Sequence, residues 1–354
     1  MRSIRPDIAE VLAQTKQFLH TEKTGMALIQ IKSIAELQQP SLDLTQYHLP
    51  NDYQTYLDDG AERTIAYWKK RLAVNDHSVP AFGPWYGIAE HSAFLGGKVT
   101  FAANTSWQEV TVPNLEDLSG ISMDENNAIY QIVIGGITHI RKKYGDLLAP
   151  QVRGTSGALE IANALRGNDF FYDFYEDPDN LKKLLAVCRD AIIWYYNKQL
   201  EAAGDYYGGV VTGFGQWLEG RPLGHLSEDT TTMISLAQYE EFGRPYTQAI
   251  CDQFDDAFIH THAMSERCLG AISHIKGIKV MELSSDPNTD RAIEVYRRNK
   301  NEFDAIPTLC LTQKEIEQNM ALLKSQKTII WYEAQTVQEA QEICALVRTQ
   351  LPVE

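Results

Sequence analysis

Two short apolar stretches, AIPTLCL at residues 305–311 and TIIWYEA at 328–334, decide the fold class of this chain. Each leads within two residues to a threonine with a glutamate three positions further on, at 312 and 315 and at 336 and 339. This spacing is typical of a capping box, in which hydroxyl and carboxylate satisfy free N–H groups at a helix start. A buried strand that leads directly into a capped helix is the unit of a parallel sheet, so the pattern predicts an α/β protein.

The same kind of apolar stretch recurs along the chain. Eight segments are predicted as strands: 26–32, 78–83, 150–154, one within 206–217, 256–262, 277–283, 305–311 and 328–334. Several are apolar on both faces, as parallel strands are when helices cover them. Eight such units favour a closed (β/α)8 TIM barrel. An open doubly wound sheet is the alternative, and the absence of GxGxxG after the first strand argues against it.

Helix boundaries are also visible in the sequence. Asp177 followed by Pro178 predicts a helix start, since Asp caps well and Pro suits the first helical position. Gly204 is placed to end that helix in a left-handed conformation. Asp124 and Ser235 precede two further helical patterns and are predicted to start them.

The length and composition predict one large domain. The chain has 354 residues, 44% of them hydrophobic, and no Pro-rich or Gly/Ser-rich linker divides it. We therefore expect a single domain over residues 1–354, with a leader and the first strand in 1–75 and the remainder of the barrel in 76–350. Residues 34–75 read as polar and helical, which predicts an N-terminal helical extension.

Charge and cysteine content exclude some classes of function. A net charge of −15 would repel a phosphate backbone, so we expect no nucleic-acid partner. Five cysteines without a CxxC pair fit a reducing compartment, and the N-terminus lacks the apolar core of a signal peptide. No run reaches 18 apolar residues, which predicts no membrane span. The expected location is the cytoplasm, and a homodimer is expected from the general prevalence of twofold oligomers.

One block carries a family resemblance. The stretch GTSGALEIANALRGNDFFYDFYEDPDNLKKLLAVCRDA at 154–191 resembles the uroporphyrinogen decarboxylase superfamily, with its Gly-rich turn, its helix ending in Gly and its Phe-Tyr-Asp-x-Tyr-Glu-Asp-Pro run. Supporting segments lie at 227–246, 258–263 (FIHTHA) and 95–101 (LGGKVTF). The resemblance spans roughly residues 75–350. It implies a (β/α)8 barrel with its site at the C-terminal ends of the strands.

Several family positions differ in this chain. The first strand carries only Lys32 where decarboxylases open with an Arg-rich segment that clamps carboxylates. The family's catalytic Asp aligns near Gly87 and its catalytic Tyr near Asn163, and WYEAQT at 331–336 replaces the family's Gly-His-Gly. These differences argue against decarboxylation in the haem pathway.

The other branch of the superfamily resembles zinc-dependent, corrinoid-linked methyltransferases. There a His-x-Cys at the fifth strand end and a later Cys bind zinc, which holds a thiol as thiolate. This chain has His260-x-His262 at that position and Cys310 on the seventh strand, so these three are the candidate metal ligands. Alternate residues on a strand point to one face, so both histidines can approach one ion. The alternative is a hydrogen-bonded pair lining a pocket with no cofactor.

Other candidates follow from their places at predicted strand ends. Asp229 and Glu282 are candidate catalytic carboxylates that guide protons, and Arg153 is a candidate anchor for an anionic substrate. Aromatic residues in the Gly-rich loops are expected to form an apolar wall that binds a ligand; these are Trp85, Tyr86, Phe214 and Trp217.

Three classes of function follow from these candidates. The first is a zinc-assisted methyltransferase acting on a small thiol or a corrinoid-bound methyl group. The second is a decarboxylase whose carboxylated substrate, which could be a tetrapyrrole, has fewer carboxylates than uroporphyrinogen. The third is a non-catalytic binding barrel, for example a partner of a corrinoid protein. We favour the first for its metal ligands, and expect a small-molecule substrate.

Overall fold

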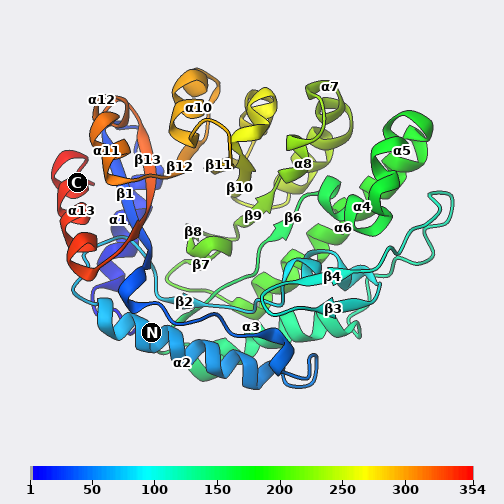
Figure 1. The fold of residues 1–354 in the computed structure, drawn as a ribbon, viewed down its shortest axis with the longest axis horizontal. Coiled ribbons are helices and arrows are strands. Elements are labelled where there is room, and N and C mark those ends of the chain that lie inside the picture. Colours follow the sequence, from blue (N-terminus) through cyan, green and yellow to red (C-terminus); the bar gives the residue numbers. More distant parts are fainter. Residues whose placement is uncertain (1–2, 354) are drawn as a thin grey trace.

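A seven-stranded, all-parallel sheet forms the centre of the molecule (Figure 1). The computed structural model describes residues 3–353. The strand order is β1 (Met26–Ile34), β13 (Lys327–Ala334), β12 (Ile306–Cys310), β11 (Ile278–Ser284), β10 (Ala257–His262), β9 (Leu223–Ser227) and β6 (Thr155–Ser156). The predicted α/β class with a parallel sheet is confirmed.

Three small sheets contain the remaining strands. β2 (Ala81–Phe82) pairs in parallel with β5 (Ala149–Pro150), while β3 (Val99–Phe101) pairs antiparallel with β4 (Ser106–Gln108), and β7 (Gly209–Val211) with β8 (Trp217–Glu219). The strands follow one another in barrel order, but no ladder joins β1 to β2 within residues 3–353. Closure by a continuous ladder, which the sequence predicted, is therefore not found.

Backbone and side-chain hydrogen bonds join β1 to the segment before β2. The N–H of His77 donates to the carbonyl of Ile29 (2.7 Å), and the N–H of Ile31 donates to Oδ2 of Asp76 (2.9 Å). Burial lowers the pKa of His77 to about 3, so its ring is neutral and Nδ1 accepts from the N–H of Ile29 (3.1 Å). A set of backbone and side-chain hydrogen bonds thus takes the place of a ladder here.

The helices lie outside the strands (Figure 1). They are α1 (Ile8–His20), α2 (Tyr53–Arg71), α3 (Ala128–Tyr144), α4 (Ala158–Arg166), α5 (Phe170–Glu176), α6 (Pro178–Ala203), α7 (Leu236–Gln238), α8 (Arg244–Cys251), α9 (Leu269–Ser273), α10 (Ala292–Asn299), α11 (Gln313–Gln318), α12 (Met320–Leu323) and α13 (Val337–Gln350). Within residues 3–353, none of them is both long enough and apolar enough to cross a bilayer.

Most predicted helix boundaries are confirmed. Asp177 caps α6, Gly204 follows its end at φ +67°, and Thr312 and Ser235 each form a complete capping box. The prediction for α3 was wrong by three residues. Its cap is Asn127, whose side chain accepts from two backbone N–H groups of the first turn, instead of Asp124.

The fourth barrel strand also differs from the prediction. The segment 206–217 contributes β7 and the first residue of β8, which form a two-stranded hairpin. The strand that enters the main sheet is β9, at Leu223–Ser227, which pairs with β10 on one side and β6 on the other. The chain therefore uses the Gly-rich region to place a hairpin before the strand.

Alternation along the strands separates two cores. Leu28, Phe258, Val280, Ile306 and Ile329 belong to one buried cluster enclosed by the strands, and their sequence neighbours pack with the helices in a second, larger cluster. Side chains two and four residues after these cluster residues lie on the same enclosed face, at the C-terminal ends of the strands. They form the site described next.

Candidate metal centre

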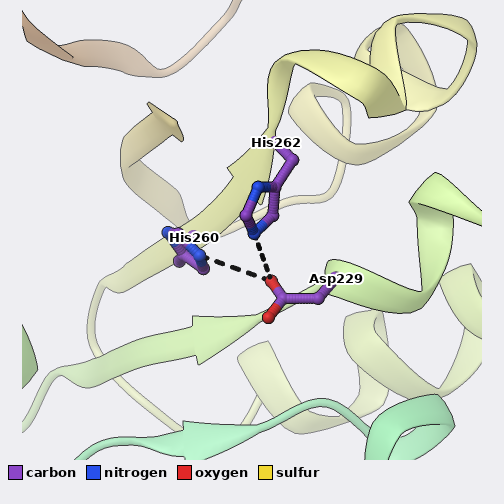
Figure 2. Close-up of side chains that lie close together, drawn as sticks. All are labelled: Asp229, His260 and His262. Carbon is purple, nitrogen blue, oxygen red and sulfur yellow. Dashed lines mark ion pairs between the residues drawn. The ribbon is translucent and has the colours of Figure 1, made fainter. Parts of the chain in front are cut away.

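Two histidines at the end of β10 converge on one carboxylate (Figure 2). His260 and His262 lie on the enclosed face of the strand, in line with Phe258. Their Nε2 atoms lie 3.4 Å and 3.5 Å from the same atom, Oδ1 of Asp229. Asp229 begins a 3₁₀ turn directly after β9, so two neighbouring strands supply the three side chains.

Each histidine is oriented through its other ring nitrogen. Nδ1 of His262 donates to Oδ1 of Asp286 (2.6 Å), and Nδ1 of His260 hydrogen-bonds with Glu282, which lies opposite it on β11. These carboxylates are themselves fixed, since Ser284 donates to Glu282 (2.9 Å) and a backbone N–H donates to Asp286 (2.9 Å). Metal-binding histidines are commonly fixed in this way, because the carboxylate sets the tautomer and directs Nε2 towards the ion.

The charges of the group are mutually stabilised. The contact with Asp229 raises the pKa of His262 to about 9, against the effect of burial. Burial alone would lower the pKa of His260, but the Glu282 carboxylate outweighs it and the pKa is raised. Burial alone would raise the pKa of Asp229, yet the two histidines hold it below its usual value. The three side chains therefore form a compact set of ion pairs.

The donor atoms of Asp229, His260 and His262 all lie within 4.8 Å of one another. Ligands 2.0–2.1 Å from a tetrahedral zinc lie about 3.3 Å apart, close to the two separations measured to Asp229. Oδ1 of Asp229 is buried and makes no hydrogen bond within the described residues. Two imidazoles and a carboxylate fit the donor set of a catalytic zinc site.

Cys310 is not part of this group. It ends β12, which is separated from β10 by β11, so two strand spacings of roughly 10 Å in total lie between them. Burial raises the pKa of its thiol to about 11. The group found in the structure thus holds Asp229, expected as a catalytic carboxylate, in place of the expected cysteine.

Sequence comparison identifies the family. The model of the family described as uroporphyrinogen decarboxylase (URO-D) matches residues 72–311, more than half of the chain. The chain belongs to the URO-D family. A methyltransferase from Methanosarcina mazei has a similar fold, with a TM-score of 0.62 and 14% sequence identity over 99% of both chains. No curated protein matches the sequence.

The side chain of Arg153 is already paired in this member of the URO-D family. Its guanidinium forms an ion pair with the buried carboxylate of Glu90 and lies 4.0 Å from the ring centroid of Trp85. Burial lowers the pKa of Arg153 to about 9. The cation expected to anchor an anionic substrate is therefore already paired, through a glutamate that the sequence analysis did not single out.

The four aromatic candidates have different environments. Phe214, at φ +58°, stacks on His225 with ring centroids 3.9 Å apart and lies 5.2 Å from the ring of His260, so it borders the metal group. Trp85 is partly exposed and covers the Arg153 pair. Tyr86 and Trp217 are buried; Trp217 packs with α1 and donates to a backbone carbonyl, 2.9 Å away. The expected four-residue wall is not assembled.

A cavity of about 410 Å³ opens beside Asp229. It is lined by the turn after β9, by α4, by β4 and by the 3₁₀ turn at 88–91. Two titratable residues on its wall were missed from the sequence. Burial, with the charge of Asp229, raises the pKa of Glu160 to about 7, while burial lowers the pKa of His91 to about 4. His91 is therefore neutral at pH 7.

Proposed function

We propose that this protein is a metal-assisted methyltransferase in which Asp229, His260 and His262 hold a zinc ion. The observation that carries the proposal is the convergence of both Nε2 atoms on one carboxylate oxygen, with each Nδ1 fixed by a second carboxylate. This is the arrangement of a zinc site with three protein ligands and an open fourth position.

A zinc ion bound there would supply Lewis acidity that stabilises a small thiol as its thiolate at neutral pH. In the proposed reaction, the sulfur gives up its proton and bonds to a methyl carbon, while the bond from that carbon to its donor breaks and leaves its electron pair on the donor. The donor could be a corrinoid-bound methyl group carried by a partner protein. Glu282 and Asp286 keep the imidazoles oriented throughout.

Two further observations support a methyltransferase over a decarboxylase. The M. mazei methyltransferase shares the fold over almost the whole chain. Arg153, the cation that would anchor a substrate carboxylate, is paired with Glu90. A decarboxylase acting on a carboxylated substrate needs such a cation free, because a desolvated carboxylate requires a compensating charge.

Metal analysis tests the proposal directly. Protein supplied with zinc and then dialysed is expected to retain about one zinc per chain. The metal should be lost in His262→Ala and Asp229→Ala, and retained in Cys310→Ala and in His274→Ala, a matched histidine control on the surface. Zinc-loaded protein should then transfer a methyl group from methylcobalamin to a thiol, measured by the loss of free thiol. Absence of zinc from the wild type, or retention in His262→Ala, would refute the proposal.

A further inference from the structure

In the part of the chain that the structure describes, the cavity beside the metal centre is lined by acidic side chains and by no basic side chain that is charged at pH 7. Two carboxylates, Asp229 and Glu160, lie on its wall, and no lysine or arginine is found among the described residues that line it. The third titratable residue, His91, is neutral, because its pKa is held near 4 by burial. The described lining thus offers carboxylate oxygens, and no lysine or arginine, to a ligand that enters.

Glu160 has an unused acceptor atom. Its Oε1 accepts from the N–H of Thr230 (2.6 Å), while Oε2 is buried and has no hydrogen-bond partner within the described residues. A buried carboxylate oxygen without a partner is costly, and an approaching cation would offset that cost. Asp229, whose side chain is 45% exposed, lies on the same wall.

The remaining surface of the cavity is apolar. Ile88, Trp107 and Met233 line it and are 57%, 61% and 60% exposed, which is high for large apolar side chains. An indole ring attracts a cation through its face, and quaternary ammonium groups are commonly recognised by such rings together with carboxylates. The combination matches a compact cation that carries apolar substituents.

We propose that this cavity binds a small onium compound, such as an alkylated ammonium, with its charged head towards Glu160 and its alkyl groups against Trp107 and Met233. The inference deepens the proposed function and rests on it for the role of the compound, which would lie beside the thiol held at the metal centre. Binding itself depends only on the cavity. The same described lining opposes polycarboxylate substrates, since it offers no lysine or arginine to pair with their charges.

Calorimetric titration with choline and with its neutral isostere, 3,3-dimethylbutan-1-ol, tests the inference. We expect choline to bind at least tenfold more tightly than the alcohol. Glu160→Gln should weaken choline binding about tenfold and leave the alcohol unchanged. Glu240→Gln, which removes a surface carboxylate paired with Arg244, serves as the matched control and should change neither affinity.

Equal affinity for choline and the alcohol, or unchanged choline binding in Glu160→Gln, would overturn the inference. Because Glu160 is largely buried, Trp107→Leu gives a second variant at an exposed position, and it should also weaken choline selectively. Zinc content is measured on the same samples. Choline binding by a protein that holds no zinc would refute the metal centre and support the cavity assignment. Zinc binding without a preference for choline would support the metal centre and refute the cavity assignment.

Discussion

Asp76→Asn is expected to destabilise the whole fold. The Asp76 side chain is fully buried where β1 meets the segment before β2. It accepts hydrogen bonds from Arg5 (3.1 Å), Arg71 (2.5 Å), Ser78 (2.5 Å) and the N–H of Ile31 (2.9 Å). The substitution keeps the shape of the side chain but removes its charge, so two buried guanidinium groups lose their shared carboxylate.

The magnitude follows from the burial of both partners. Arg5 and Arg71 are only 4% and 2% exposed, and breaking a buried ion pair on one side costs about 3–5 kcal/mol. The entropy of unfolding is about 2.1 cal/mol/K per residue, which gives roughly 0.74 kcal/mol/K for 354 residues. The melting temperature of Asp76→Asn should therefore fall by about 4–7 °C.

Thermal unfolding followed by circular dichroism measures this shift. Glu219→Gln is the control, because it removes a partly exposed carboxylate that pairs with Lys16 and His20, and should cost about 1 kcal/mol or less. A melting temperature for Asp76→Asn within about 1 °C of the wild type would refute the reasoning.

The effect of Asp76→Asn should also depend on pH. Burial alone would raise the pKa of Asp76, but Arg71 and Arg5 outweigh it and lower the pKa in the folded state. The stabilisation is thus present above the unfolded-state pKa of about 3.9 and is lost as pH falls through the folded-state value. The difference in melting temperature between wild type and Asp76→Asn should be constant from about pH 5 to 8 and should become smaller below about pH 4.

Three further predictions concern the site and its surroundings. Asp286→Asn should weaken zinc binding about 10–100-fold in chelator competition, whereas Asp290→Asn, on the same loop, should leave it unchanged; equal affinities in both variants would contradict the orienting role of Asp286. Cys310, whose pKa is about 11, should react with iodoacetamide at pH 7.5 at least about a hundredfold more slowly than a free thiol, measured by mass spectrometry; a rate equal to that of the free thiol would contradict its burial. Gly87→Ala should lower the free energy of unfolding several-fold more than Gly208→Ala does. A Cβ at Gly87 would lie 2.2 Å from a backbone nitrogen of β4. A Cβ at Gly208 meets no described atom within 4 Å, so that variant costs about 1 kcal/mol for positive φ alone. Equal unfolding midpoints would exclude that overlap.

Much of the fold could be predicted because its signals are local. The strand at Ile306–Cys310 and the capping box of Thr312 lie next to each other in the sequence, and both are found as expected. The strand at Leu223–Ser227 was missed because a glycine and a histidine interrupt its apolar pattern within a Gly-rich region. The junction between β1 and the segment before β2 depends on long-range contacts of Asp76 and His77, which no local pattern reveals.

The site could be predicted only in part, for a similar reason. His260 and His262 alternate on one strand, so the sequence itself places them on one face. Asp229 was expected near them, but its role as the third member of the group depends on the turn after β9. Glu160 comes from a helix of another βα unit, and only the fold brings it beside Asp229.

Phe214 has a consequence for access to the candidate metal centre. Its backbone lies in the left-handed region, which costs a non-glycine residue roughly 1–2 kcal/mol, while its stacking on His225 contributes roughly 0.5–1.5 kcal/mol. The two contributions nearly cancel. If the ring leaves His225 and the backbone leaves the left-handed region at the same time, the relief of the backbone offsets the lost stacking. The ring also gives up its contacts with Phe258, His260 and Trp331. The aromatic ring that borders His260 is thus held against the preference of its own backbone.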